Sequence, residues 1–369
     1  MPRTTVDPVI NGSSGRRVTI PESSSVERVL VIGGAGFVGS VLVRQLLDRG
    51  YEMTVLDALM YGDESLHDLM EHPRFRLVRG DLRDIEAVVS ASHGSDAIVH
   101  LGALVGDPAC DLDEELAREI NLDATRTVAA VARGLGIERM IFASTCSVYG
   151  ASDDLLDEDS ALDPISLYAR TKRDAETFLL SMNGGSFGPV VLRFGTFFGA
   201  SARARFDLVV NTLVAKAVVE REITITGGSQ WRPFVHVADG AEAIIRCLEA
   251  PLDVVSHQVF NVGSDRENHT LAEVAEIVAA AVPGVSVNFA EQAMTEANYR
   301  VSFARIRDAL DFQPMRTVAD GVAEIKAAIE SGEVGDYADA RYSNIKSLAL
   351  GESVRALEHE EPSLAAAAG

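Results

Sequence analysis

The sequence predicts an α/β protein with a Rossmann-type, doubly wound parallel sheet and a smaller, discontinuous α/β substrate lobe. Short apolar segments alternate with helical segments as far as Phe194, which is the pattern of a parallel sheet covered on both faces. A glycine-rich turn joins the first apolar segment to the first helix. Beyond Phe194 the alternation stops, and mostly helical segments with short strands indicate a second lobe.

The glycine-rich turn is the most specific local signal. A buried strand precedes it and a helix over Val38–Asp48 follows, which is the order of a dinucleotide-binding turn. Gly33 lets the strand turn sharply, Gly36 lets the backbone approach a pyrophosphate, and Gly39 lets the helix pack close to the strand. The first-turn N–H groups of the helix then point at the phosphates. The expected cofactor-binding residues of this turn are Gly33, Gly36, Phe37, Val38 and Gly39.

An acidic residue ends the second predicted strand. Met53–Leu56 is followed by Asp57, at the distance where a carboxylate meets the hydroxyls of the adenosine ribose. A carboxylate accepts hydrogen bonds from a free 2′-OH and repels a 2′-phosphate. The sequence therefore predicts NAD, rather than NADP, as cofactor; the alternative for the turn alone is a tight connection without a ligand.

The remaining strands and the domain limits follow from the same pattern. Further strands are expected at Phe75–Val78, Ala97–Leu101, Arg139–Ser144, Val190–Phe194 and Val259–Gly263, with a long helix around Leu116–Leu135. The predicted organisation is a disordered tail over 1–26, an NAD-binding domain over 27–195 to which 234–263 returns, a substrate lobe from 196–233 and 264–350, and a tail over 351–369.

Composition excludes several classes of protein. The 369 residues carry a net charge of −22, which disfavours binding to nucleic acid or to anionic lipid. No apolar run reaches the ~20 residues of a membrane span. The three cysteines show no metal-ligand spacing, and we expect reduced thiols, no metal site and a cytoplasmic location.

Three residues have the chemistry of proton transfer at a carbinol. Tyr168 and Lys172 lie four apart on a predicted helix and so share a face, and Thr145 ends a predicted strand. A phenol has an ordinary pKa near ~10, which a neighbouring ammonium and a cationic nicotinamide ring would lower. Thr145 would donate a hydrogen bond to the same substrate oxygen. An exposed Tyr and a solvated Lys are the alternative, which the glycine-rich turn disfavours.

These motifs together resemble the extended short-chain dehydrogenase/reductases, specifically the NAD-dependent nucleotide-sugar epimerase/dehydratase family. The matching segments are Gly33–Gly39, Gly80–Arg83, His100–Ala103, Asn121–Thr125, Thr145–Gly150, Tyr168–Lys172 and Arg232–Asp239, in family order across 29–312.

The resemblance implies a role for each matching residue. Tyr168 would be the acid–base group, Lys172 would also bind the nicotinamide ribose, and Asp81 and Leu82 would flank the adenine, with Leu101, Gly102 and Ala103 along the cofactor. Arg232 would hold a substrate phosphate. The other expected substrate contacts are Thr196, Arg205, Asn211 and Arg300, and a homodimer through helices near 107–135 and 166–182 is expected.

Departures from the family pattern limit the type of reaction that we expect. Cys146 and Ser147 stand where 4,6-dehydratases carry an Asp-Glu pair, so elimination of water is disfavoured, and Thr196 replaces a common Asn. The sequence therefore predicts a nucleotide-sugar epimerase acting at C4 through a transient keto sugar. A ketoreductase or dehydrogenase of the same superfamily is the alternative, and a catalytically silent NAD-sensing protein is a third. His100, His236 and Cys146 are interpreted as structural.

Overall fold

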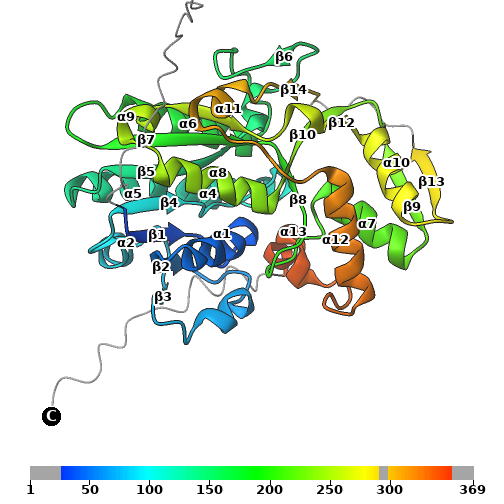
Figure 1. Cartoon of the computed structure of the whole chain (residues 1–369), viewed down its shortest axis with the longest axis horizontal. Coiled ribbons are helices and arrows are strands. Elements are labelled where there is room, and N and C mark those ends of the chain that lie inside the picture. The colour runs from blue at the N-terminus through cyan, green and yellow to red at the C-terminus, as the bar shows by residue number, and fades with distance from the viewer. Residues whose placement is uncertain (1–25, 291–297, 351–369) are drawn as a thin grey trace, which may run out of the picture.

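The computed structural model describes residues 26–290 and 298–350 (Figure 1). The tails predicted over 1–26 and 351–369 therefore lie outside the described residues, except for Val26.

A seven-stranded parallel sheet forms the larger part of the molecule, in the order β11-β7-β5-β4-β1-β2-β3. Its strands are β1 Arg28–Ile32, β2 Glu52–Asp57, β3 Phe75–Arg79, β4 Ala97–His100, β5 Arg139–Thr145, β7 Gly188–Phe194 and β11 Val259–Val262. Each predicted strand is present within one to two residues at either end. The chain order reverses between β1 and β4, which opens a crevice at the carboxyl ends of these strands.

Helices cover both faces of this sheet, as Figure 1 shows. On one face, α1 (Phe37–Asp48) and α8 (Val237–Glu249) pack on residues such as Val31 and Ile141. On the other, α2 (Ile85–Ser92), α5 (Ala124–Gly134) and α6 (Leu167–Ser181) bury residues such as Leu30 and Phe142. The predicted doubly wound α/β fold is confirmed.

The long helix expected around Leu116–Leu135 is interrupted. It consists of α4 (Glu114–Arg118), a π-helical turn over Glu119–Asp123, and α5. Asn121 lies in that turn, where its side chain accepts a hydrogen bond from the Leu104 N–H at 2.8 Å and donates one to the Leu104 carbonyl at 3.0 Å. The helix is thus tied to the loop after β4, which borders the crevice.

The smaller lobe lies beside the carboxyl ends of the sheet (Figure 1). Its elements are β8 Thr196–Phe198, α7 Val209–Val219, β9 Glu222–Thr226, β10 Trp231–His236, β12 Asn268–Thr270, α10 Leu271–Ala281, β13 Ser286–Ala290 and α12 Val318–Glu330. β8, β10 and β12 form one small sheet, and β9 pairs with β13. Thr270 and Thr317 each open a helix with a capping box.

The chain crosses between the two parts several times. After β10 it returns through α8, α9 (Leu252–Val255) and β11 to the large sheet, and α11 (Ala304–Leu310) packs against β11. Near its end, α13 (Asn344–Ala349) packs on α3 (Asp107–Leu112) of the large part. The short remaining elements are η1 Glu64–Leu69, η3 Cys146–Tyr149, β6 Leu155–Leu156, η4 Asp265–Glu267, β14 Arg300–Val301 and η5 Ala340–Tyr342.

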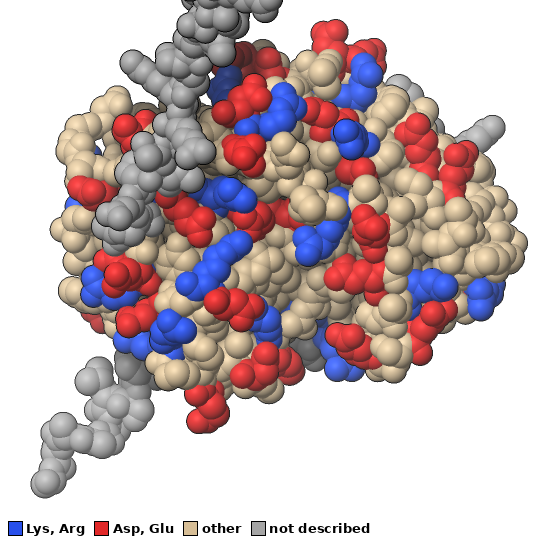
Figure 2. Space-filling view, in the orientation of Figure 1, with Lys and Arg blue, Asp and Glu red and all other residues tan. Residues whose placement is uncertain are grey.

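The surface shown in Figure 2 carries acidic and basic side chains interspersed, without a broad basic area on this face. In the part of the chain that the structure describes, no helix combines the length and apolarity needed to cross a bilayer.

Candidate active site

One pocket at the carboxyl ends of the sheet brings together the glycine-rich turn, Asp57 and the predicted Thr, Tyr and Lys. Residues from both parts of the molecule line it, among them Thr196, Arg203 and Arg205 from the smaller lobe. The pocket is therefore the crevice in which the predicted cofactor and substrate would meet.

The turn after β1 is shaped by close backbone packing. Gly33 has φ of +84°, and a Cβ there would lie 2.7 Å from the backbone N of Gly102. A Cβ on Gly39 would overlap the Gly33 carbonyl. Gly36 is the N-cap of α1 and offers no side-chain cap, so the first-turn N–H groups of α1 are available to an anionic ligand. This cradle has the backbone donors and the close packing that a pyrophosphate would need, and the contacts of the individual residues stay predictions.

Asp57 is fixed by the backbone beside this turn. Its carboxylate accepts hydrogen bonds from the N–H of Ala35 at 2.9 Å and of Leu59 at 2.8 Å. Burial raises the pKa of Asp57, and these two donors counteract the rise. The geometry holds one carboxylate at the end of β2, where a ribose 2′-OH would reach it.

The segments after β3 and β4 contribute further predicted cofactor-binding residues to the pocket. Asp81, Leu82, Leu101, Gly102 and Ala103 all line it. The Asp81 carboxylate is paired with Arg83 at 2.8 Å, which in turn pairs with Glu119 at 2.8 Å.

The end of β5 and the first turns of α6 bring the Tyr–Lys pair to the catalytic end of the pocket. Ser166 caps α6 by accepting a hydrogen bond from the Ala169 N–H at 3.1 Å, and this sets the helix so that Tyr168 and Lys172 both line the pocket. The Lys172 ammonium donates to the Ala143 carbonyl at 2.9 Å and lies 6.0 Å from the centre of the Tyr168 ring. The two side chains are neighbours, as the four-residue spacing predicted.

Burial dominates the ionisation of this pair. It raises the pKa of Tyr168 above its ordinary value and lowers the pKa of Lys172 to about 8. The protein groups around Tyr168 thus shift its pKa opposite to the expected direction. A bound nicotinamide ring would add a positive charge that, with the Lys172 ammonium, favours the phenolate.

Thr145 and two further hydroxyls complete this end. The Thr145 hydroxyl donates to Ser147 Oγ at 3.1 Å, and Ser147 Oγ lies 3.3 Å from the hydroxyl of Tyr299. Tyr299 is 4% exposed and lines the pocket, whereas the sequence analysis selected its neighbour Arg300. Arg300 points elsewhere, because its guanidinium lies over the Trp231 ring and donates to the Asp153 carbonyl. Alternation along an extended chain explains this difference.

Of the other predicted substrate contacts, the structure places some in the pocket and others outside it. Thr196 and Arg205 line the pocket, and Arg205 forms a bidentate pair with Asp207 at 2.9 and 3.1 Å. Asn211 is buried in α7, where it donates to the carbonyls of Gly199 and Arg205 and so shapes the loop between β8 and α7. Arg232 is not among the lining residues; its guanidinium lies 5.5 Å from the Tyr299 ring centre. Roles for these residues in substrate binding stay predictions.

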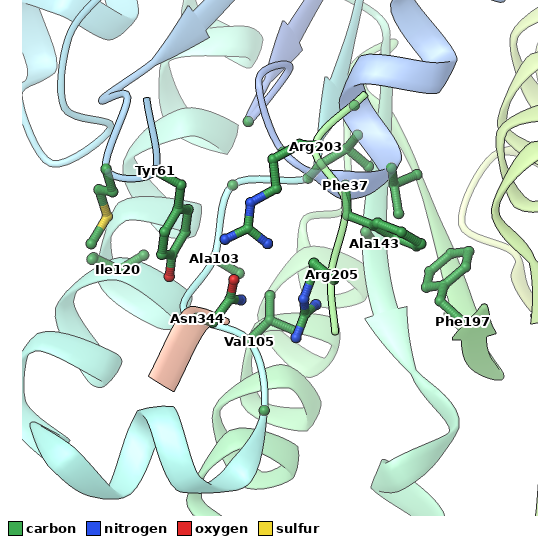
Figure 3. A pocket seen from close by; sticks show the side chains of 18 of the residues that line it. Phe37, Tyr61, Ala103, Val105, Ile120, Ala143, Phe197, Arg203, Arg205 and Asn344 are labelled. Carbon is green, nitrogen blue, oxygen red and sulfur yellow. The ribbon is translucent and has the colours of Figure 1, made fainter. Parts of the chain in front are cut away.

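Tyr61, Arg203 and Asn344 point into the pocket as well, as Figure 3 shows. Tyr61 and Asn344 were not among the predicted site residues. The three residues come from a loop after β2, the loop after β8 and the start of α13. Of the three, only Arg203 could have been suspected from the sequence, because it is a second cation close to Arg205 in an acidic chain.

His100, His236 and Cys146, which were interpreted as structural, form hydrogen bonds within the fold. Nε2 of His100 lies 2.9 Å from the Thr125 hydroxyl, and His236 caps α8 by accepting from the Ala238 N–H. Cys146 is fully buried, and its thiol donates to the Arg193 carbonyl at 3.2 Å. Burial raises the pKa of this thiol well above its ordinary value.

A glycine-rich turn at α1 and a Tyr–Lys pair at the carboxyl end of the same sheet define an NAD-dependent enzyme of the short-chain dehydrogenase/reductase type. Residues 29–263 match the model of the "NAD dependent epimerase/dehydratase family". The chain belongs to this family, which confirms the predicted resemblance and the NAD cofactor.

The proteins that resemble this chain include epimerases and a decarboxylase. The chain is 28% identical to a UDP-glucose 4-epimerase of Corynebacterium glutamicum, over 68% of this chain and 79% of that protein. It is 28% identical to UDP-glucuronic acid decarboxylase 1 of Arabidopsis thaliana, over 84% and 72%. The crystal structure of the Thermus thermophilus UDP-glucose 4-epimerase complex with NAD matches with a TM-score of 0.70 at 28% identity, covering 82% of this chain and 99% of that one.

Proposed function

We propose that the chain interconverts the C4 epimers of a UDP-linked hexose. The observation that carries this proposal is a single pocket lined by the glycine-rich turn and by Thr145, Tyr168 and Lys172, without a carboxylic acid at Cys146 or Ser147. Relatives named UDP-glucose 4-epimerase support the choice of nucleotide and of carbon.

The residues at the catalytic end divide the proton chemistry. NAD held in this pocket would supply reversible hydride transfer at the sugar carbon. Tyr168 takes the proton of the C4 hydroxyl as the hydride leaves, and it gives the proton back to the same oxygen when the hydride returns to the other face of the turned sugar. Lys172 orients the nicotinamide ribose and stabilises the phenolate, and Thr145 holds the reacting oxygen by a hydrogen bond.

The substrate side would bind the nucleotide and its diphosphate. We infer that the lobe formed by 196–233 and 264–350 carries this task, with Arg205 toward a phosphate and Thr196 and Tyr299 near the sugar. We also propose a homodimer through α5 and α6, together with the segment from α3, in a four-helix interface. Size-exclusion chromatography with light scattering tests the dimer, and a monomer at all concentrations contradicts it.

Incubation with UDP-glucose and NAD, followed by chromatography, tests the reaction. The epimer should accumulate to a constant ratio without net formation of NADH. Stoichiometric NADH would instead indicate a dehydrogenase, and release of CO2 from UDP-glucuronic acid a decarboxylase.

Dehydration is a separate test of the same site. Elimination needs an acid at the leaving 6-hydroxyl, and Cys146 is buried with its thiol turned to Arg193. We therefore expect no 4-keto-6-deoxy product from dTDP-glucose. Its steady accumulation would overturn the epimerase proposal.

A further inference from the structure

Three polar side chains meet in the pocket without a hydrogen-bond partner in the described part of the chain. These atoms are the Tyr61 hydroxyl, Nε and Nη2 of Arg203, and Oδ1 of Asn344. Arg203 is 6% exposed and Asn344 is 4% exposed. Buried polar groups are nearly always paired, so a cluster of unpaired ones facing a pocket indicates a ligand.

The arginine is the strongest member of this cluster. Its guanidinium lies 4.3 Å from the centre of the Tyr61 ring, and burial together with nearby Arg205 lowers its pKa to about 10. Arg205 is neutralised by its bidentate pair with Asp207, whereas no ion pair is formed by Arg203 among the described residues. The Asp207 and Asp57 carboxylates act on Arg203 from a distance, but neither forms a direct ion pair with it. A buried cation without a direct partner is costly, and an anionic ligand relieves that cost.

The pocket would hold two diphosphates, one from NAD and one from the nucleotide sugar. The position of Arg203 favours a contact with the diphosphate of NAD. Ser201, two residues earlier, donates from its hydroxyl to the Phe37 carbonyl at 2.7 Å and lies 2.9 Å from the Ser40 hydroxyl. The loop is thereby attached to the first turn of α1, which is the phosphate-binding turn. Arg203 therefore lies in the loop that is attached beside this turn, where the diphosphate of the cofactor would lie, while Arg205 is two residues further along.

Asn344 is held beside Arg203 by contacts of α13 and of the segment that precedes it. Its backbone N–H donates to the Asp207 carboxylate at 2.9 Å, and the Phe206 N–H donates to the Tyr342 carbonyl at 2.8 Å. Leu348, one turn further on, packs into a cluster with Leu104, Cys110 and Ile120. The helix α13 is thus attached both to the Arg203 loop and to the large domain.

We propose that Tyr61, Arg203 and Asn344 form a clasp that binds the diphosphate bridge of NAD on the side opposite the glycine-rich turn, and that α13 keeps this clasp closed. Arg203 donates to the phosphate oxygens, and the Tyr61 hydroxyl and Asn344 amide bind phosphate or ribose oxygens. This inference concerns the cofactor and does not depend on which sugar is converted.

Calorimetric titration of the full chain, stripped of cofactor, tests the clasp with NAD, ADP-ribose and adenosine as probes. Arg203→Met should weaken NAD and ADP-ribose by about 10- to 100-fold, the usual value of a charge-assisted hydrogen bond, and leave adenosine unchanged. Arg203→Lys should lose less affinity, because lysine keeps the positive charge but lacks the paired N–H donors of the guanidinium. Arg341→Met is the matched control: Arg341 also lies over a tyrosine ring, but it is exposed and outside the pocket.

Three outcomes would overturn the assignment. Unchanged NAD affinity in Arg203→Met would show that the arginine does not meet the cofactor. A weakened affinity for UDP in the NAD-loaded variant, with ADP-ribose binding intact, would assign the clasp to the substrate's diphosphate instead. An equal loss for adenosine would mean a collapsed pocket and would equally contradict the proposal.

The role of α13 has its own readout in the rate of NAD release. Asn344→Ala should speed release several-fold, because it removes a contact while sparing the backbone hydrogen bond to Asp207. Leu348→Ala should also speed release, although Leu348 does not line the pocket. Wild-type release rates in both variants would show that α13 does not close the clasp.

Discussion

At the scale of single residues, the site depends on side chains whose environments differ sharply. Tyr168 and Lys172 are both buried, and their pKa values move in opposite directions because burial disfavours whichever form is charged. His100 is buried nearby, and burial with the adjacent Lys172 lowers its pKa to about 3. Each of these shifts leads to a measurable effect.

Replacement of Tyr168 by Phe should abolish most turnover while fold and bound NAD remain. The change deletes one hydroxyl, and general acid–base catalysis contributes about 10²–10⁴ in rate. Epimer formation and the NAD content of the purified variant measure the two effects. Tyr337→Phe serves as control, because its hydroxyl bonds to Glu220 outside the pocket. Near-normal turnover of Tyr168→Phe would place the proton transfer on another group.

His100 should make the protein sensitive to acid. Its folded-state pKa of about 3 lies below the ordinary 6.5, so between these values the unfolded chain binds a proton that the folded chain does not. Its contribution to stability is therefore present above pH 6.5 and is lost as the pH falls toward 3, by at most about 1.4 kcal/mol per pH unit. In His100→Gln the free energy of unfolding should depend less steeply on pH between about 6 and 4. Identical slopes in chemical denaturation would contradict this.

At the scale of elements, a buried ion pair attaches the catalytic helix to the sheet. Glu176 of α6 pairs with Arg193 of β7 at 2.8 Å, and both side chains are at most 5% exposed. The Ser144 hydroxyl also donates to Glu176, and Arg193 donates to the hydroxyl of Tyr149. The helix that carries Tyr168 and Lys172 is thereby fixed against the strand that ends in Thr145.

Removal of one partner of this pair should be strongly destabilising. Glu176→Leu or Arg193→Met should each cost about 3–5 kcal/mol, because an unpaired charge stays buried. The double variant should cost clearly less than the two single costs together. Chemical denaturation of the four proteins measures this cycle, and simple additivity would show that the two residues do not interact.

The elements that the sequence predicted best are those with a strong local pattern. The strands of the large sheet and α1 were found because apolar runs and glycines mark their ends. The break of the 116–135 helix was missed, because a π turn held by Asn121 and the distant Leu104 leaves no periodic signal. Likewise, Asn344 enters the pocket from α13, and no spacing along the chain connects it to Arg203.

At the scale of the whole molecule, the repeated crossings of the chain should make unfolding cooperative. The sequence contains one tryptophan, Trp231, which lies on β10 of the smaller lobe. Its fluorescence reports on that lobe, while far-UV circular dichroism reports mainly on the larger part. We expect the two thermal transitions to coincide and to rise together on addition of NAD. Separate transitions would show that the two parts unfold independently.

The hydrogen bonds of Asn211 have a consequence for engineering of this enzyme. Its amide holds the backbone of Gly199 and Arg205, which lie at the two ends of the segment that presents Arg203. Residues 200–204 are thus held at both ends by Asn211 and, in between, by the hydrogen bonds of Ser201 to α1. A library that varies residues 202–204 while retaining Gly199, Ser201, Arg205 and Asn211 would change the ligand contacts of this loop and keep its attachment, whereas transfer of the loop without Asn211 would lose its shape.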